Sequence, residues 1–144
     1  MALSRASQAI VQRIWGDPEK SDARSGVGGR ETLAATGYSR PAALPKSGGR
    51  YGLHLQWDAT AAPNGTFTIQ YSGLPSPDES TDNDWVTDTT VVVLGTSLTV
   101  AGAAGNTMII AGNIPPGGWV RVKWTRTSGS LDVAGYISNA GHNG

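Results

Sequence analysis

The sequence contains no cysteine, and this absence excludes several kinds of chemistry. Without a thiol the chain forms no disulfide, has no thiolate nucleophile and offers no cysteine-based metal site. Histidine is also scarce, since only His54 and His142 occur in 144 residues. No G-x-S-x-G motif and no second metal ligand accompany His54. We therefore expect no catalytic residue, no cofactor and no metal centre, and we predict that the protein is not an enzyme.

Long hydrophobic runs and an excess of either charge are lacking as well. No stretch approaches the roughly 18 apolar residues of a membrane span, and the first 15 residues lack the apolar run of a secretion signal. The 11 basic and 11 acidic residues give a formal net charge of zero. Nucleic-acid binding usually needs a basic excess beside exposed aromatics. Neither a membrane nor a nucleic acid is therefore an expected partner.

Apolar residues alternate with polar ones after residue 49, and Gly and Pro interrupt the alternation. This period of two is typical of short strands separated by turns. The sequence predicts about eight strands and an antiparallel β-sandwich of jelly-roll type over residues 50–144. Asn64-Gly65 predicts a hairpin turn between two of the strands. The alternating apolar sets that support this interpretation include Leu53, Leu55 and Trp57; Phe67, Ile69 and Tyr71; and Val120, Val122 and Trp124.

Residues 1–49 differ in composition and are predicted to form an N-terminal arm. Apolar residues at helical spacing predict a short helix over residues 3–15. Residues 17–49 are rich in Ser, Gly, Arg and Pro, so we expect them to be mostly irregular. Such a segment either stays mobile or orders against a neighbouring chain, and we expect the arm's apolar residues to bind a partner chain. These partner-binding candidates are Ile10, Ile14, Trp15, Leu33, Tyr38 and Leu44.

A second set of candidates lies on the predicted outer faces of the sandwich. Aromatic and Arg side chains are enriched at protein interfaces, so Trp119 and Arg121 are candidate interface residues together with His54 and Lys123. The loop near residues 78–88 carries five carboxylates. It is interpreted as a solvated loop, since EF-hand spacing is absent, and calcium binding by this loop is left open.

The segment Gly118–Ile137, GWVRVKWTRTSGSLDVAGYI, resembles the C-terminal strands of small structural proteins of tailed bacteriophages. Gly65–Ser72, GTFTIQYS, is similar to another strand of those proteins. The resemblance implies a jelly-roll virion protein without catalytic residues that assembles into symmetric oligomers, with a trimer favoured over a dimer. It leads to the hypothesis of a capsid decoration, or cement, protein. Such a protein is made in the host cytoplasm. It binds the major capsid protein on the capsid exterior through its arm and its oligomeric β-sandwich, and it stabilises the head shell.

The alternative is a carbohydrate- or receptor-binding module of a head fibre, tail fibre or neck protein. Sandwiches that bind sugars often stack them on exposed Trp side chains. This alternative predicts that Trp85 or Trp119 is exposed near the acidic loop.

Overall fold

A computed structural model describes residues 10–16, 29–44, 51–110 and 117–139. All secondary-structure elements among these residues are β-strands, and every strand pair is antiparallel. The predicted all-β antiparallel sandwich of jelly-roll type is thereby confirmed. In chain order the strands are β1 (Ile10–Trp15), β2 (Glu31–Leu33), β3 (Gly37–Tyr38), β4 (Ala42–Ala43), β5 (Tyr51–Ser72), β6 (Val86–Thr87), β7 (Val92–Gly95), β8 (Thr99–Ala101), β9 (Gly105–Ile110) and β10 (Trp119–Asn139).

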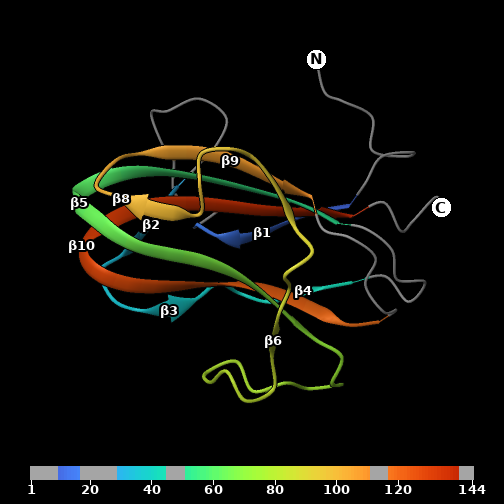
Figure 1. Ribbon diagram of the computed structural model, residues 1–144. Helices are drawn as coiled ribbons and strands as arrows, with labels where there is room; N and C mark the ends of the chain where they lie inside the picture. The colour runs from blue at the N-terminus through green and yellow to red at the C-terminus, as the bar shows by residue number, and fades with distance from the viewer. Residues whose placement is uncertain (1–9, 17–28, 45–50, 111–116, 140–144) are drawn as a thin grey trace.

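The two long strands, β5 and β10, form a bent ribbon on which the whole fold is built. They pair from one end to the other, and both bend near their middles, where the register shifts between Arg126 and Leu131. Positive φ angles at Ala62 (41°) and Gly129 (74°) mark the corner. Each strand therefore contributes one half to each of two layers, which are joined at the bend (Figure 1).

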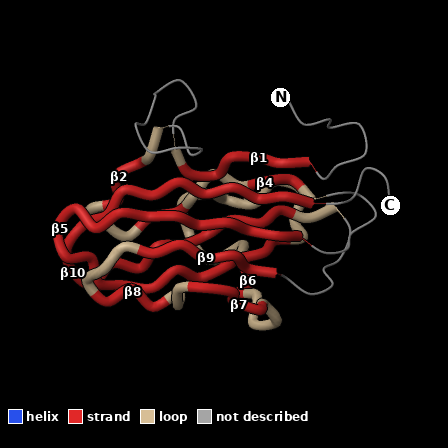
Figure 2. The backbone as a smooth tube through the Cα atoms, turned by 90° about the horizontal axis from the view of Figure 1, so that it is seen from above, coloured by secondary structure: helices blue, strands red, loops and turns tan. Residues whose placement is uncertain are grey.

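The shorter strands extend these two layers. One layer combines the first half of β5 and the last half of β10 with β1, β2, β9 and β7, and the other combines the remaining halves with β3, β4, β6 and β8. Seen from above, the long strands of the upper layer run side by side (Figure 2).

The predicted hairpin at Asn64-Gly65 is wrong. The two halves of β5 do not pair with each other, because each half pairs with β10 instead. Gly65 is required for a different reason: a Cβ at this position would lie 2.3 Å from the Thr125 carbonyl oxygen and 2.7 Å from the Trp124 ring. The glycine thus allows close packing of β5 on β10.

Aromatic side chains fill the space between the layers. Phe67, the only phenylalanine in the sequence, contacts the rings of Trp15, Trp57 and Trp124 at centroid distances of 5.7, 5.0 and 4.7 Å. None of the four side chains is more than 2% exposed. Tilted and edge-on ring pairs of this kind contribute about 0.5–1.5 kcal/mol each beyond the burial of their surface.

The described residues of the predicted arm are part of the sandwich. Strands β1–β4 all pair with β10, and Ile14, Trp15, Leu33 and Leu44 belong to the protein's own core. These side chains are therefore not available to a partner chain. Residues 29–44 are not an irregular arm, since their strands complete the unpaired side of β10.

The predicted helix over residues 3–15 is wrong for residues 10–15, which form β1. A register shift between Arg13 and Trp15 interrupts the pairing with β10, and the consecutive residues Ile14 and Trp15 are both buried. This irregularity conceals the period of two in the sequence. Residues 3–9 lie outside the described residues, as does the side chain of Ile10, whose backbone pairs with Asn139.

Because Trp15 lies in the core and not on a binding arm, Trp15→Ala is expected to lower the free energy of unfolding by about 3–5 kcal/mol. Denaturant unfolding, followed by circular dichroism, measures the change. Val86→Ala is the control, since Val86 is 62% exposed and its truncation is expected to change stability by no more than about 0.5 kcal/mol. A Trp15→Ala variant as stable as the parent protein would contradict this placement.

Candidate functional site

The first half of β10 directs its side chains alternately to the core and to the outer face. Val120, Val122 and Trp124 are completely buried in the core. Trp119 and Arg121 therefore lie on the outer face, as the alternation predicts. Arg121 is nevertheless 0% exposed, because the loop between β5 and β6 covers it.

The Arg121 guanidinium lies between two aromatic rings. Its central carbon is 3.7 Å from the centroid of the Tyr38 ring and 4.1 Å from that of Trp85. Its nitrogens donate hydrogen bonds to Gln70 Oε1 (2.8 Å) and to the backbone carbonyls of Glu79 (2.8 Å) and Thr81 (2.6 Å). Burial lowers the pKa of Arg121, but arginine stays protonated in proteins. Arg121 thus fixes the acidic loop to the outer face by stacking and hydrogen bonding together.

Asp82 is the acidic counterpart of this arrangement. Its carboxylate accepts hydrogen bonds from Gln70 Nε2 (2.9 Å), Tyr38 Oη (3.1 Å) and Lys123 Nζ (2.5 Å), and it lies 3.6 Å from Arg121. These donors, Gln70 and Lys123 foremost, lower the pKa of Asp82 from 3.8 to about 2. The carboxylate is therefore ionised through almost the whole pH range.

The loop that was interpreted as solvated is exposed at Asp78, Glu79 and Asp82, and hydrogen bonds tie its backbone. Besides the contacts to Arg121, the Trp85 indole donates to the Asp78 carbonyl at 2.8 Å, and Asp84 accepts from the Asp78 amide at 2.7 Å. Hydrogen bonds from Ser80 lower the pKa of Asp78. Among the described residues, no three His, Cys, Asp or Glu side chains are grouped so that they could hold a metal ion. The carboxylates of Asp78 and Asp84 accept hydrogen bonds from backbone amides of the loop.

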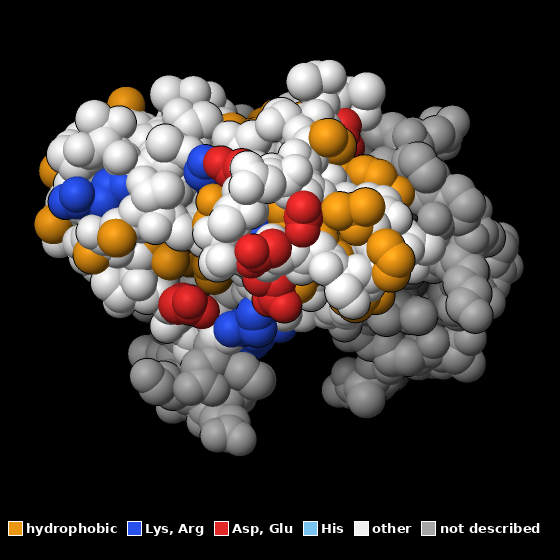
Figure 3. Space-filling model, turned by 90° about the horizontal axis from the view of Figure 1, so that it is seen from below, with side chains coloured by type: hydrophobic (Ala, Val, Ile, Leu, Met, Phe, Trp, Pro, Cys, Tyr) orange, Lys and Arg blue, Asp and Glu red, His pale blue; other side chains and the backbone are white. Residues whose placement is uncertain are grey.

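A cleft of about 210 Å³ opens where this loop meets the start of β10. Trp119 forms one wall, and Pro41, Pro75 and Pro77 form apolar walls around it. Glu79 supplies an exposed carboxylate at the same cleft. Viewed from below, acidic side chains gather over this face of the molecule, next to basic and hydrophobic ones (Figure 3).

The two tryptophans that the sequence offered as contact residues have different roles in the structure. Trp85 is 6% exposed and stacks on Arg121, so its role is structural. Trp119 is partly exposed and lines the cleft. Since Arg121 holds the Glu79 carbonyl, the loop side of the cleft is already shaped before any ligand binds. Ligand sites in proteins are typically preformed hollows with apolar walls and a few polar groups.

The four predicted interface residues do not form one surface. Arg121 is buried, and Lys123 is engaged by Asp82. His54 lies on the other layer, where its Nε2 is hydrogen-bonded to Asn106 Oδ1. Of the arm candidates, Tyr38 covers Arg121. Only Trp119 among these residues lines the cleft.

The sequence matches no protein-family model and no curated protein. Solved structures of similar fold include the CBM35 module of Cellvibrio japonicus Abf62, with a TM-score of 0.48 and 14% identity over 94% of this chain and 99% of that chain. Another is the carbohydrate-binding module CBM6cm-2 of Cellvibrio mixtus lichenase 5A, with a TM-score of 0.42 and 13% identity over 89% and 96% of the two chains. The Podospora anserina GH26-CBM35 β-(1,4)-mannanase has a TM-score of 0.43 and 10% identity over 93% of this chain and 28% of that chain. Likeness at this level is one of fold.

The hypothesis of a capsid decoration protein is wrong. The structures of similar fold named above are carbohydrate-binding proteins, and none of them is a virion protein. The arm that was expected to bind the shell is also built into the protein's own sandwich, where Trp15 and Leu44 are buried. The expected capsid-protein partner, self-association and virion location are not tested by these observations. Among the described residues, no helix is long and apolar enough to cross a membrane.

Several residues of the cleft were not recognised in the sequence. Pro75 and Pro77 were assigned only to a loop, and Pro41 lies 34 residues or more away from them in the chain. The sequence signal that was available is the Pro-Ser-Pro-Asp-Glu run itself, which combines rigid apolar and charged residues. Its position beside Trp119 follows from the pairing of β5 with β10.

If Arg121 fixes the loop through ring stacking and its planar group of donors, lysine cannot replace it. We expect Arg121→Lys to make residues 73–84 sensitive to limited proteolysis, with cleavage sites identified by mass spectrometry. Arg126→Lys on the same strand is the matched control, because Arg126 is exposed and its Nε donates to the Gly129 carbonyl outside the acidic loop. Equal resistance of Arg121→Lys and the parent protein would show that positive charge alone holds the loop.

The lowered pKa of Asp82 predicts a pH dependence of stability. A carboxyl that binds its proton less readily when folded contributes stability above its unfolded pKa, near 3.8, and loses it as the pH falls through about 2. The melting temperature of the parent protein should therefore fall more steeply between about pH 4 and pH 2 than that of Asp82→Asn. Parallel melting curves for the two proteins across this window would refute the assignment.

Proposed function

We propose that the protein is a carbohydrate-binding module whose ligand stacks on Trp119. The observation that carries this proposal is that the partly exposed Trp119 lines a cleft together with three prolines and Glu79. A sugar ring has a face of C–H groups and a rim of hydroxyls. It therefore needs a flat apolar surface next to a few hydrogen-bonding groups, and the cleft contains both.

The cleft is suited to a small part of a larger glycan. Its volume of about 210 Å³ is below the roughly 300–1,000 Å³ of sites that enclose a whole drug-sized ligand. The proline walls flank the indole and have few conformations to lose on binding. Glu79 and Ser76 line the same cleft. The Glu79 carboxylate can accept hydrogen bonds from sugar hydroxyls, and the Ser76 hydroxyl can donate to them or accept from them.

Rigid placement of the loop supports recognition without a large conformational change. Arg121 holds the backbone at Glu79 and Thr81, and Leu44 donates from its backbone amide to the Gly118 carbonyl at 2.8 Å, next to Trp119. Both sides of the cleft are thus tied to β10. Preorganised groups bind with a smaller loss of conformational entropy.

Removal of the Trp119 ring tests the proposal. Trp119→Ala should weaken binding to the preferred glycan by about tenfold or more, as loss of a central aromatic contact does, whereas Trp119→Phe should retain part of the affinity. A glycan array identifies the ligand, and isothermal titration calorimetry measures the affinities. Melting temperatures verify that each variant is folded. The proposal fails if the parent protein binds no glycan or if Trp119→Ala binds with unchanged affinity.

A further inference from the structure

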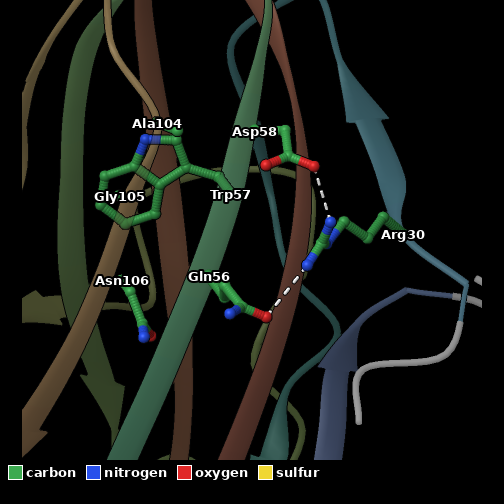
Figure 4. Close-up of a pocket in the computed structure, with 7 residues that line it drawn as sticks. All are labelled: Arg30, Gln56, Trp57, Asp58, Ala104, Gly105 and Asn106. Atoms are coloured by element: carbon green, nitrogen blue, oxygen red, sulfur yellow. Dashed lines mark hydrogen bonds and ion pairs between the residues drawn. The ribbon is translucent and has the colours of Figure 1, made fainter. Parts of the chain in front are cut away.

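A second hollow lies on the outer face of the other layer. It has a volume of about 560 Å³ and is open to solvent. Gln56 and Asp58 reach it from β5, Asn106 reaches it from β9, and Arg30 reaches it from the segment before β2 (Figure 4). Gln56 and Asp58 alternate with the core residues Leu55 and Trp57, so β5 directs their side chains away from the core.

Arg30 organises the polar side of this hollow. Its side chain is 4% exposed, and its Nη1 donates to Asp58 Oδ2 at 2.7 Å. The neighbouring Nη2 donates to Gln56 Oε1 at 3.0 Å. The guanidinium thus holds both the carboxylate and the amide in place, and the side chain of Asp58 remains 37% exposed.

These contacts fix the orientation of two side-chain amides, because each amide oxygen already accepts a hydrogen bond. Because Gln56 Oε1 accepts from Arg30, its Nε2 is turned away from Arg30 toward Asn106 (Figure 4). Asn106 Oδ1 is hydrogen-bonded to His54 Nε2, which assigns the donor role to Asn106 Nδ2. A carboxamide nitrogen carries two N–H donors. The hollow therefore presents amide donors on one side and a carboxylate acceptor on the other.

The base of the hollow is rigid. A Cβ on Gly105 would lie 2.2 Å from the Trp57 ring, so glycine permits the backbone to pack directly on the indole. The indole nitrogen donates to the Ala103 carbonyl at 3.1 Å. The small residues Ala104 and Gly105 leave the space above open (Figure 4). The hollow is therefore fixed in shape on its apolar side and on its polar side.

We propose that this hollow is a second glycan-binding site that takes an uncharged, polyhydroxylated ligand. Sugar hydroxyls would accept hydrogen bonds from Gln56 Nε2 and Asn106 Nδ2 and donate one to Asp58. Vicinal hydroxyls suit this alternation, since each can donate and accept. The site stands on its own contacts and does not depend on the cleft at Trp119.

The charges of the lining residues favour a neutral ligand. Among the described residues that line the hollow, Arg30 and Asp58 carry charge, and they form an ion pair at 2.7 Å. An anionic ligand would have to compete with Asp58 for the guanidinium, and a cation would have to compete with Arg30 for the carboxylate. A neutral sugar can hydrogen-bond to the two amides and to the exposed part of Asp58, and it leaves the ion pair intact.

Two sites on opposite outer faces would make the protein bivalent. Trp119 lies on the layer that contains the second half of β5, whereas Gln56 lies on the layer that contains the first half. One molecule could then hold two chains of a polysaccharide. Binding to a surface with many copies of the ligand would be stronger than either site alone provides, because the second contact forms at a high effective concentration.

Four forms of the full chain test this proposal: the parent protein, Trp119→Ala, the double variant Gln56→Glu with Asn106→Asp, and the combination of all three changes. The double variant removes both amide donors at nearly constant volume. It keeps the oxygens that accept from Arg30 and His54, so we expect it to fold, and a melting curve verifies this. Each form is applied to an array of neutral and acidic glycans, and calorimetry follows for the glycans that bind.

We expect Trp119→Ala to keep the part of the binding to uncharged glycans that the second site provides. The Gln56→Glu and Asn106→Asp changes should lower the affinity of that site about tenfold, as loss of two hydrogen bonds does. The combined variant should bind none. Unchanged binding by the double variant, or binding of acidic glycans alone to Trp119→Ala, would overturn the second site.

The array also distinguishes this proposal from the one for the cleft. If Trp119→Ala abolishes all binding and the double variant changes nothing, the second site is refuted and the cleft stands. If the double variant abolishes all binding and Trp119→Ala changes nothing, the second site stands and the cleft is refuted. Absence of any glycan binding by the parent protein refutes both.

Discussion

The continuous pairing of β5 with β10 is the constraint on which the rest of the structure depends. Because both strands bend at the same place, near Ala62 and Gly129, one ribbon forms the centre of two layers and brings its own inner faces together. Phe67 then meets Trp57 from the other half of the same strand at 5.0 Å. Every remaining strand pairs with this ribbon, apart from β7, which pairs with β9. The two outer faces and their hollows are consequences of the bend.

A buried charge has an equally specific role on the outer face. Arg121 lies between the rings of Tyr38 and Trp85 and donates hydrogen bonds to two loop carbonyls. The acidic loop is thereby held against the outer face of the sheet, where it forms one side of the cleft at Trp119. Arg30 acts similarly on the other layer, where it fixes Asp58 and Gln56. In each case a guanidinium orders groups from distant parts of the chain. Arginine suits this task because its donors form a rigid planar set.

The expectations that failed were those that depended on pairing partners. Asn64-Gly65 is a strong local signal for a hairpin, but it cannot indicate that β10, more than 50 residues later, pairs with both flanking segments. Residues 10–15 have apolar residues at helical spacing, yet they form a strand because they pair with β10. A register shift between Arg13 and Trp15 lets both Ile14 and Trp15 be buried. Tertiary pairing outweighs local propensity at these positions.

The sequence by itself determined the all-β class and the direction of many side chains. Period-two alternation places Val120, Val122 and Trp124 inside and Trp119 outside, because successive side chains of a strand point to opposite faces. Only the tertiary structure decided that Arg121, on the outer face, is buried, and that Arg30, Gln56 and Asn106 meet at one hollow. Periodicity states which way a side chain points from its own strand. Which loop covers that face, and which residues from other strands lie beside it, depends on contacts between residues far apart in the chain.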